Sequence, residues 1–374
     1  MRLSQPALDS SEVAAVTRVL QSEFLGMGKE VIEFEKLLSE FFANEVVCVN
    51  TGTSALQLAL SASGIGLGDE VLVPSLTYVA TYQAISALGA IPVSCDVQED
   101  DLQIDVRDSQ RRITKKTKAI VPVYFSGATN CADRVYEFSL ANNLVNIPDA
   151  AHAFGSSHQG QRVGSGIGTN IFSLDGIKNI TSGEGGIIVS SNPDVIKRAS
   201  DARLLGVSGD SAKRASRERS WDFDVESQGW RFHMSDLFAA IGKVQLGKFD
   251  SFAQSRKELF SHYLEMLADE PRIELPGWDI AGGMVPHIFV IRIPRMTSRE
   301  VLRESLASKG IPTGIHYKPN HLLSYYQNSQ AFPLINTMRI YPEILTLPLH
   351  PRLTRQEQVE IVEKLRSCIN DAFK

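Results

Sequence analysis

Residues 172–186 read Phe-Ser-Leu-Asp-Gly-Ile-Lys-Asn-Ile-Thr-Ser-Gly-Glu-Gly-Gly, and they place Lys178 between two apolar runs. The first run, residues 170–174, is a predicted strand. A glycine-rich turn then leads to the second run at residues 187–189. If the lysine is buried in an apolar cleft, its ammonium loses hydration, its pKa falls, and the free amine becomes a usable nucleophile. Imine formation with a carbonyl cofactor requires such an amine. A lysine beside a glycine-rich hairpin is also common in plain surface turns. Other segments of the chain are therefore needed to choose between a buried nucleophile and a surface turn.

A second segment, residues 46–56, has the pattern of a phosphate-binding strand, turn and helix. Apolar residues 46–49 are followed by Asn-Thr-Gly-Thr-Ser-Ala-Leu and then by helical spacing up to Gly64. Free backbone N–H groups at the positive end of such a helix attract phosphate. Small hydroxyl residues also begin helices simply as caps, and the pattern alone leaves both interpretations open.

Strand and helix patterns alternate through the first two thirds of the chain, which predicts an α/β fold with a mostly parallel sheet covered on both faces. Strands are predicted at residues 91–95 and 119–123, with helical patterns at 81–88 and 133–142. Ligands bind at the carboxyl ends of strands in such sheets. Asp149 follows one of these ends, although an aspartate before two alanines is also a common helix N-cap.

Four separated segments, residues 50–56, 149–155, 172–186 and 229–242, resemble in order the motifs of the DegT/DnrJ/EryC1/StrS family of pyridoxal-phosphate (PLP) sugar aminotransferases. The lysine motif of that family reads roughly Phe-Ser-Phe-His-x-x-Lys-Asn, followed by Gly-Glu-Gly-Gly. This chain has Leu174 and Asp175 at the aromatic and histidine positions but keeps the lysine, which related sugar 3-dehydratases replace by histidine.

The resemblance implies the PLP-dependent transferase fold type I, with a seven-stranded, mostly parallel sheet between helices in a large domain and a smaller C-terminal α+β domain. Near Lys248 the pattern changes to a long helix and then to strands predicted at residues 285–293 and 311–316. We therefore expect a PLP-binding domain over residues 1–248 and a small domain over 249–374. The amphipathic helix expected at residues 9–21 is a candidate to pack on the small domain. The polar tract at residues 208–226 is expected to form a surface loop.

The resemblance also implies a cofactor, PLP, held as an internal aldimine on Lys178, while Asp149 keeps the pyridine nitrogen protonated. These two residues are the expected catalytic residues. The same motifs imply a phosphate cradle, an aromatic residue stacked on the ring, and His152 near the ring face or its phenolic oxygen. The other implied cofactor-binding residues are Gly52, Thr53, Ser54, Tyr78, Ser173, Arg231 and His233.

The segment Gly-Trp-Arg-Phe-His-Met at residues 229–234 resembles a family segment, Gly-Tyr-Asn-Tyr-Arg-Met, that reaches the PLP phosphate of the neighbouring subunit. Here Arg231 stands at the asparagine position and His233 at the arginine position, so either is a candidate for that contact. The resemblance therefore implies a homodimer with composite active sites.

The segment at residues 314–321 resembles the family's His-Tyr-x-Pro-x-His loop. It implies that His316, Tyr317 and Lys318 bind substrate at the site entrance. The spacing of His316 and His321 also suggests a metal, but the segment has no carboxylate or cysteine, so we expect no metal.

Composition narrows the class of partner. The chain has 374 residues, 43% hydrophobic and 22% charged, as expected of a soluble protein with one large core or two unequal domains. Its net charge of −5 argues against nucleic acid or an anionic membrane as a main partner. Four cysteines without a CxxC pair suggest reduced thiols and a cytoplasmic location. No signal peptide or long apolar run is visible, so no membrane insertion is expected.

The resemblance implies an aminotransferase of the EC 2.6.1 class that moves an amino group from L-glutamate to a nucleotide-linked keto-deoxysugar. Examples of such a substrate are a dTDP-, GDP- or UDP-4-keto-6-deoxyhexose, or a 3-keto isomer. The product would be an amino sugar for surface polysaccharide or glycoside biosynthesis. The alternatives are a PLP-dependent sugar dehydratase or other lyase, and a non-catalytic regulatory homologue. The last should have lost Lys178 or Asp149, and this chain has both.

Overall fold

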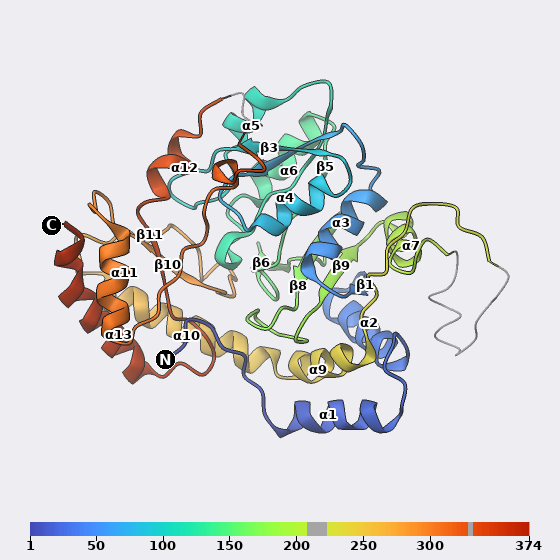
Figure 1. The fold of residues 1–374 in the computed structure, drawn as a ribbon, viewed down its shortest axis with the longest axis horizontal. Helices are drawn as coiled ribbons and strands as arrows, with labels where there is room; N and C mark the ends of the chain where they lie inside the picture. The colour runs from blue at the N-terminus through green and yellow to red at the C-terminus, as the bar shows by residue number, and fades with distance from the viewer. Residues whose placement is uncertain (208–222, 328–331, 374) are drawn as a thin grey trace.

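The central feature of the computed structural model, which describes residues 1–207, 223–327 and 332–373, is a sheet built from two ladders (Figure 1). Its strands are β1 Glu45–Val49, β2 Glu70–Pro74, β3 Ile91–Cys95, β4 Thr117–Ile120, β5 Val145–Asn146, β8 Thr169–Ser173 and β9 Gly186–Ser190. Four parallel strands pair in the order β3-β2-β4-β5, and three antiparallel strands pair in the order β1-β9-β8. Asp149, just after β5, pairs in parallel with Ile171 of β8 and joins the two ladders. In the resulting seven-stranded order, β3-β2-β4-β5-β8-β9-β1, only β9 runs against the others.

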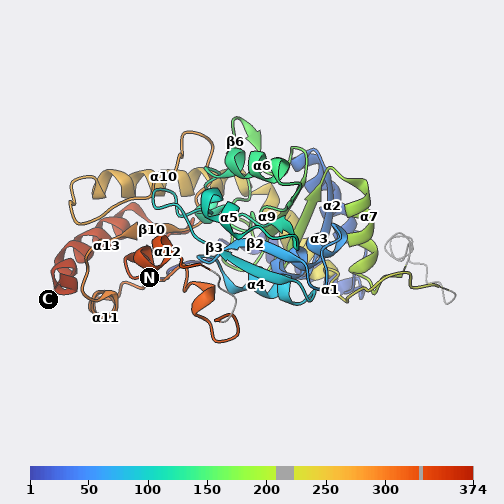
Figure 2. The same ribbon diagram turned by 90° about the horizontal axis from the view of Figure 1, so that it is seen from above.

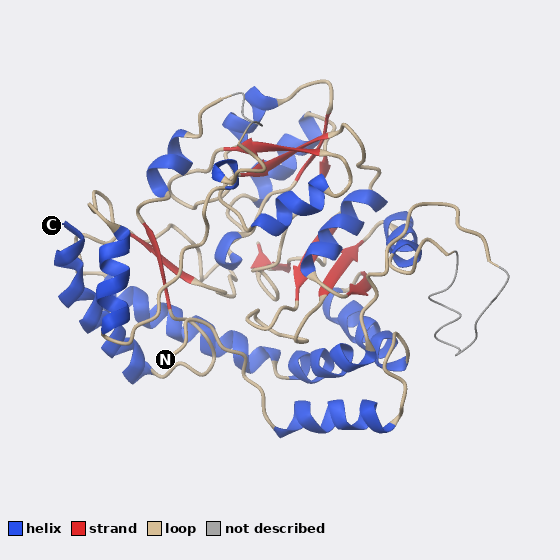
Figure 3. Ribbon diagram, in the orientation of Figure 1, coloured by secondary structure: helices blue, strands red, loops and turns tan. Residues whose placement is uncertain are grey.

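Alternate side chains of the strands enter two apolar cores, one on each face of the sheet. In β1, Val47 and Val49 belong to the core covered by α3, α4 and α7, whereas Val46 and Cys48 belong to the core covered by α2, α6 and α9. This period-two burial on both faces is what a sheet between two helical layers requires. Figure 3 shows the strands flanked by these helices. The helices of the two layers are α2 Lys29–Phe42, α3 Gly52–Ala62, α4 Val79–Ser86, α6 Ala132–Ala141, α7 Pro193–Ala202 and α9 Asp236–Gly247.

The α/β fold expected from the sequence, with its mostly parallel seven-stranded sheet, is therefore confirmed. The smaller described elements of this part are α5 Val106–Arg112, the 3-10 turn η1 Phe125–Gly127, and a hairpin of β6 Ser157–His158 and β7 Gln161–Arg162. The polar tract expected as a surface loop lies mostly outside the described residues.

A third apolar core gathers most of its residues from the C-terminal part of the chain. There β10 Phe289–Arg292 pairs antiparallel with β11 Ile344–Leu347, and helices pack around this pair. Figure 2 shows the group at the end of the molecule that carries the C-terminus. Its remaining elements are α10 Phe249–Leu267, α11 Arg299–Ser308, η2 Asn320–Leu322, α12 Ile335–Ile340, α13 Arg355–Cys368 and η3 Ile369–Phe373.

Strand expectations in this C-terminal part were only partly right. The run at residues 285–293 contains β10, but the strand expected at 311–316 is reduced to one bridge between Gly314 and Thr346 of β11. We propose Lys248, the single residue between α9 and α10, as the boundary of the large domain.

Helix α1, Ser10–Gln21, packs against α9 through Ala15, Val19 and Ala240. The residues before this helix reach the C-terminal part instead: the Leu349 N–H donates to the Leu3 carbonyl at 3.2 Å. The N-terminal segment therefore touches both parts of the molecule, whereas α1 itself lies on the large-domain side of the proposed boundary. Within the described residues, none of the helices has the length and apolar character needed to cross a membrane.

Candidate active site

A cavity of about 450 Å³ opens at the carboxyl edge of the parallel strands. The loops after β1, β2, β5 and β8 line it, and the segment at residues 316–317 closes one side. This is the edge at which ligands bind in parallel sheets. The structure brings nine of the expected site residues together here: Gly52, Thr53, Tyr78, Asp149, His152, Ser173, Lys178, His316 and Tyr317.

Lys178 is held by the turn that follows β8. Its backbone N–H donates to the Asp175 carbonyl at 3.0 Å, and the Asp175 carboxylate accepts from the Ile177 N–H at 3.1 Å. Burial lowers the pKa of the Lys178 amine to about 8; Asp149 and Asp175 oppose this shift. A substantial fraction of the amine is therefore neutral near physiological pH, as a nucleophile requires.

Asp149 is a buried carboxylate, 6% exposed, whose two oxygens each accept one hydrogen bond. The Thr81 hydroxyl donates to one oxygen at 2.9 Å, and the Ala151 N–H donates to the other at 3.1 Å. Burial raises the pKa of Asp149, and these bonds and Lys178 work against that rise. Asp149 thus accepts the Ala151 N–H and also lines the cavity. The two interpretations of its sequence position, a helix cap and a ligand-binding carboxylate, therefore do not exclude each other.

The start of α3 supplies backbone donors to the cavity. Thr51 caps the helix by accepting the Ser54 N–H on its hydroxyl at 3.0 Å, which leaves Gly52 and Thr53 in the first turn. N–H groups in a first helical turn have no acceptor within the helix. A Cβ on Gly52 would lie 2.9 Å from the Ser173 Cβ, so only glycine fits this close approach. The pair Gly52 and Thr53 can therefore present amides to an anion.

Two histidines and two tyrosines also line the cavity. His152 Nε2 lies 2.9 Å from the Tyr317 hydroxyl, and His316 Nδ1 lies 2.8 Å from the Thr346 hydroxyl. Burial lowers the pKa of His316 to about 4 and holds the pKa of His152 well below its usual value. Tyr78, 59% exposed, has its ring centroid 5.6 Å from that of Tyr317. The two histidines are therefore neutral at physiological pH.

Four expected residues do not line the cavity. Ser54 is 3% exposed and donates its hydroxyl to Asn50, so it belongs to the helix cap. Arg231 is exposed and forms a backbone bridge with Leu204, His233 forms one with Val49, and Lys318 is exposed. The described charged and histidine side chains that do line it are Lys178, His152, His316, Asp149, Asp175 and Glu184.

The sequence analysis missed several lining residues. Glu184 stands in the Gly-Glu-Gly-Gly segment and was within reach of that motif. Burial raises its pKa, and Asp175 raises it further. Asp175 was noticed only as a departure from the family pattern. Thr77 and Thr81 carry no local signal, because only the fold brings them beside Asp149.

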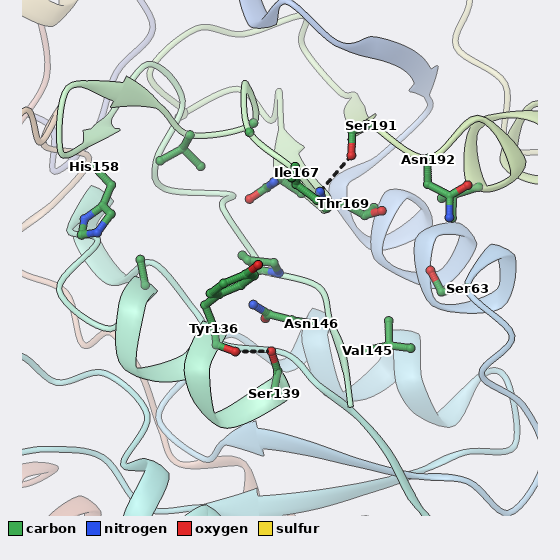
Figure 4. A pocket seen from close by; sticks show the side chains of 18 of the residues that line it. Ser63, Tyr136, Ser139, Val145, Asn146, His158, Ile167, Thr169, Ser191 and Asn192 are labelled. Atoms are coloured by element: carbon green, nitrogen blue, oxygen red, sulfur yellow. Dashed lines mark hydrogen bonds between the residues drawn. The ribbon is translucent and has the colours of Figure 1, made fainter. Parts of the chain in front are cut away.

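A larger hollow of about 890 Å³ lies at the amino edge of the same strands, between α6 and α7 (Figure 4). Two of its hydroxyls are paired with backbone groups: Ser139 donates to the Tyr136 carbonyl at 2.7 Å, and Ser191 accepts the Gly168 N–H at 3.0 Å. Among the described residues, no group of three or more His, Cys, Asp or Glu side chains is placed to hold a metal ion in either hollow.

Comparison with known proteins identifies the family to which the chain belongs. The model of the DegT/DnrJ/EryC1/StrS aminotransferase family matches residues 6–366. The chain belongs to this family. Members of the family are PLP-dependent sugar aminotransferases of fold type I, and the α/β fold of this aminotransferase matches that architecture over its full length.

Several solved structures are similar to this aminotransferase. A putative sugar aminotransferase from Streptococcus pneumoniae, solved in its PMP form, is 30% identical, with 100% of each chain covered and a TM-score of 0.91. PseC from Helicobacter pylori, an aminotransferase involved in the biosynthesis of pseudoaminic acid, is 26% identical, with 99% of each chain covered and a TM-score of 0.90. TlmJ, an aminotransferase from Streptoalloteichus hindustanus, is 28% identical, with the same coverage and TM-score as PseC.

The cavity of this aminotransferase fits PLP in the chemistry of its donors. Lys178 offers an amine of lowered pKa for the aldehyde, and the Asp149 carboxylate is available for a ring N–H. The amides at the start of α3 suit a phosphate. A volume of about 450 Å³ is within the range of small-molecule sites.

Proposed function

We propose that this aminotransferase uses PLP to move an amino group from L-glutamate to a nucleotide-linked keto-deoxysugar. The observation that carries the proposal is the joint placement of Lys178, with its lowered pKa, and the buried Asp149 in one cavity. The sugar class is supported by relatives named as sugar aminotransferases, among them the Streptococcus pneumoniae protein. The presence of both residues argues against a regulatory homologue without activity.

In the proposed reaction Lys178 has two tasks. Its neutral amine would hold the cofactor through the aldehyde carbon, with loss of water, and once the amino donor has displaced it, the same Nζ would carry a proton between the two carbons on either side of the imine nitrogen. Bound PLP supplies the electron sink that makes this carbon acidic. Asp149 would hold the ring nitrogen in its charged form from within a buried site, where such an interaction is strongest.

We further propose that the active enzyme is a cytoplasmic homodimer with composite sites. Lys178 is the one Lys or Arg side chain among the described residues that line the cavity, and it is committed to the aldehyde. Any cation that joins the α3 amides at a cofactor phosphate would therefore come from elsewhere. Arg231 is exposed and has the forked donors for a phosphate; His233 is the shorter competitor.

The reaction is tested by mixing purified, PLP-loaded protein with L-glutamate and no sugar. A transaminase converts its cofactor to the amine form and releases 2-oxoglutarate in equal amount. Subsequent addition of a panel of 4-keto and 3-keto nucleotide sugars should restore the aldehyde form with the true substrate. Release of a deaminated or dehydrated product without stoichiometric 2-oxoglutarate would instead identify a PLP lyase.

The composite site is tested by mixing two inactive variants, Lys178→Ala and Arg231→Ala, at limiting PLP. Exchange of subunits should restore activity, because one site of the heterodimer keeps both residues. A monomer by sedimentation, or no recovery after verified exchange, would contradict the proposal. A matched mixture with His233→Ala in place of Arg231→Ala tells which residue makes the contact.

A further inference from the structure

The hydrogen bonds around His152 fix which of its ring nitrogens carries the proton. The Ser126 backbone N–H donates to Nδ1 at 3.3 Å. A backbone amide can only donate, so Nδ1 must be an unprotonated acceptor. Ser126 is itself held in place, because its carbonyl accepts the His287 N–H at 2.8 Å and its hydroxyl donates to the Ile288 carbonyl. The imidazole is therefore neutral, with its single proton on Nε2.

The surroundings of His152 agree with a neutral ring. The side chain is buried, and the nearby Lys178 and His316 add to the burial in keeping its pKa well below the usual value. The ring of His287 packs behind it, with centroids 4.4 Å apart, and that buried ring is held neutral in the same way. The guanidinium of Arg256, which donates to the His287 carbonyl at 3.0 Å, lies further behind.

The proton on Nε2 sets the direction of the next hydrogen bond. Nε2–H faces the Tyr317 hydroxyl oxygen at 2.9 Å and must donate to it. Burial and the nearby Asp149 raise the pKa of Tyr317, so the phenol keeps its own proton. Since that oxygen already accepts from His152, the O–H has to donate elsewhere. No second partner for it exists among the described residues, and Tyr317 lines the cavity beside Lys178.

We propose that Tyr317 is a hydrogen-bond donor to an oxygen of the bound ligand, and that His152 is a positioning residue that orients this donor. The inference rests on the proposed function for the identity of the ligand. Two oxygens share the required chemistry: the phenolic oxygen of the cofactor and the keto oxygen of the sugar. His152 thus acts on the ligand through Tyr317, and its fixed tautomer and low basicity exclude it as the general base.

The tautomer is tested without any ligand. Protein labelled with ¹⁵N at histidine should show, between about pH 6 and 8, a neutral ring protonated at Nε2, assigned to His152 by its loss in His152→Gln. A ring protonated at Nδ1, or an imidazolium in this range, would overturn the inference. This readout is independent of the reaction, so its failure is distinct from a failure of the proposed function.

The donor is tested with Tyr317→Phe. If its partner is the cofactor oxygen, the dissociation constant of PLP should rise by roughly 10- to 100-fold, as for a lost hydrogen bond to a charged group. If its partner is the sugar, PLP affinity and the glutamate half-reaction stay intact, and kcat/KM for the keto sugar falls by a similar factor. A variant that changes neither quantity by more than about twofold contradicts the proposal. Tyr136→Phe, at a half-exposed tyrosine in the amino-edge hollow, is the matched control.

The positioning role is tested with two His152 variants. Glutamine can accept from Ser126 and donate to Tyr317, so His152→Gln should stay within about threefold of the parent. Leucine can do neither, so His152→Leu should reproduce the Tyr317→Phe defect, and the double variant should be no worse than either single variant. Additive losses, or a defect in His152→Gln as large as in His152→Leu, would contradict it. If His152→Leu does not fold, the glutamine and phenylalanine variants decide.

Discussion

Two hollows lie at opposite edges of the same strands, and the larger one is not the better candidate for chemistry. The amino-edge hollow measures about 890 Å³, against about 450 Å³ for the carboxyl-edge cavity. Helix α3 shows why their electrostatics differ: Gly52 and Thr53, at its start, line the smaller cavity, whereas Ala62 and Ser63, at its end, line the larger hollow. The positive end of the α3 dipole therefore faces the smaller cavity, whereas the first turns of α6 and α7 line the larger hollow and carry the carboxylates of Asp133 and Asp194.

The side chains divide in the same way. At the carboxyl edge an amine of lowered pKa and a carboxylate of raised pKa converge from separate loops. At the amino edge the hydroxyls of Ser139 and Ser191 are already paired with backbone groups. Volume thus says little about function here, whereas strand direction and the meeting of Lys178 with Asp149 mark the carboxyl edge as the candidate site. Substitutions at the two edges should accordingly have very different consequences.

The largest effect is expected for Lys178→Ala. Loss of the amine removes both the covalent attachment and the proton carrier, so turnover should fall by about 10⁴-fold or more. The protein should fold and hold PLP only without a covalent bond to lysine, which the absorbance spectrum and a borohydride trapping assay will show. Retention of more than about one hundredth of the activity would exclude Lys178 from both tasks.

A smaller loss is expected for Asp149→Asn. The amide oxygen can still accept the Ala151 N–H, and the amide NH₂ can donate to the Thr81 hydroxyl. The amide cannot keep a pyridinium charged, and one such electrostatic contact in a buried site is worth about 10²- to 10³-fold in kcat. The thermal midpoint should change little by comparison, because Thr81 and Ala151 both keep a hydrogen-bond partner. Near-parental kcat with a lowered midpoint would show that Asp149 is only a cap for Ala151.

The pH dependence of the Lys178 amine offers a finer test. Its pKa of about 8 includes an upward contribution from Asp175, so Asp175→Asn should lower the pKa and increase the neutral amine at pH 7. The rate of PLP incorporation into the cofactor-free enzyme, followed against pH, should rise through a midpoint near 8 in the parent and at lower pH in the variant. A pH midpoint that is unchanged or higher in the variant would contradict the expected effect of Asp175 on the Lys178 pKa. Asp194→Asn, in the amino-edge hollow, is the matched control.

The smallest effect belongs to the amino-edge hollow. Ser191→Ala removes the acceptor of the Gly168 N–H and should cost about 1 kcal/mol of stability, seen as a lower midpoint in chemical denaturation. Both kcat and KM should remain within about twofold of the parent. A large loss of turnover without a loss of stability would give this hollow a part in the reaction and undo the contrast between the edges.

The sequence predicted those candidate site residues that lie within contiguous motifs. Lys178 after β8, Asp149 after β5 and Gly52 at the start of α3 were each predicted at the end of a strand, and the sheet brings them to one edge. Thr81 was missed because its hydroxyl meets Asp149 only through the packing of α4 on the sheet. The joining of β5 and β8 through Asp149 is likewise a tertiary event that no local pattern shows.

The expected residues that do not line the cavity have physical reasons for their places. The Ser54 hydroxyl, three residues after Thr51, takes part in the helix cap. Arg231 and His233 lie on a segment whose backbone bridges Leu204 and Val49, away from the cavity of their own chain, as the proposed contact with a neighbouring subunit's phosphate requires. The strand β11 was missed because its four residues are buried throughout and lack an alternating pattern. Local sequence patterns therefore predict the candidate reactive residues better than the residues that hold them in position through tertiary packing.

The central claim, that Lys178 attaches the cofactor, is tested most directly by reducing the PLP-loaded enzyme with borohydride, digesting it and mapping the phosphopyridoxyl label by mass spectrometry. The account predicts the label on Lys178, and no labelled peptide from the amino-edge hollow. A label on any other lysine, with Lys178 unmodified, would contradict it.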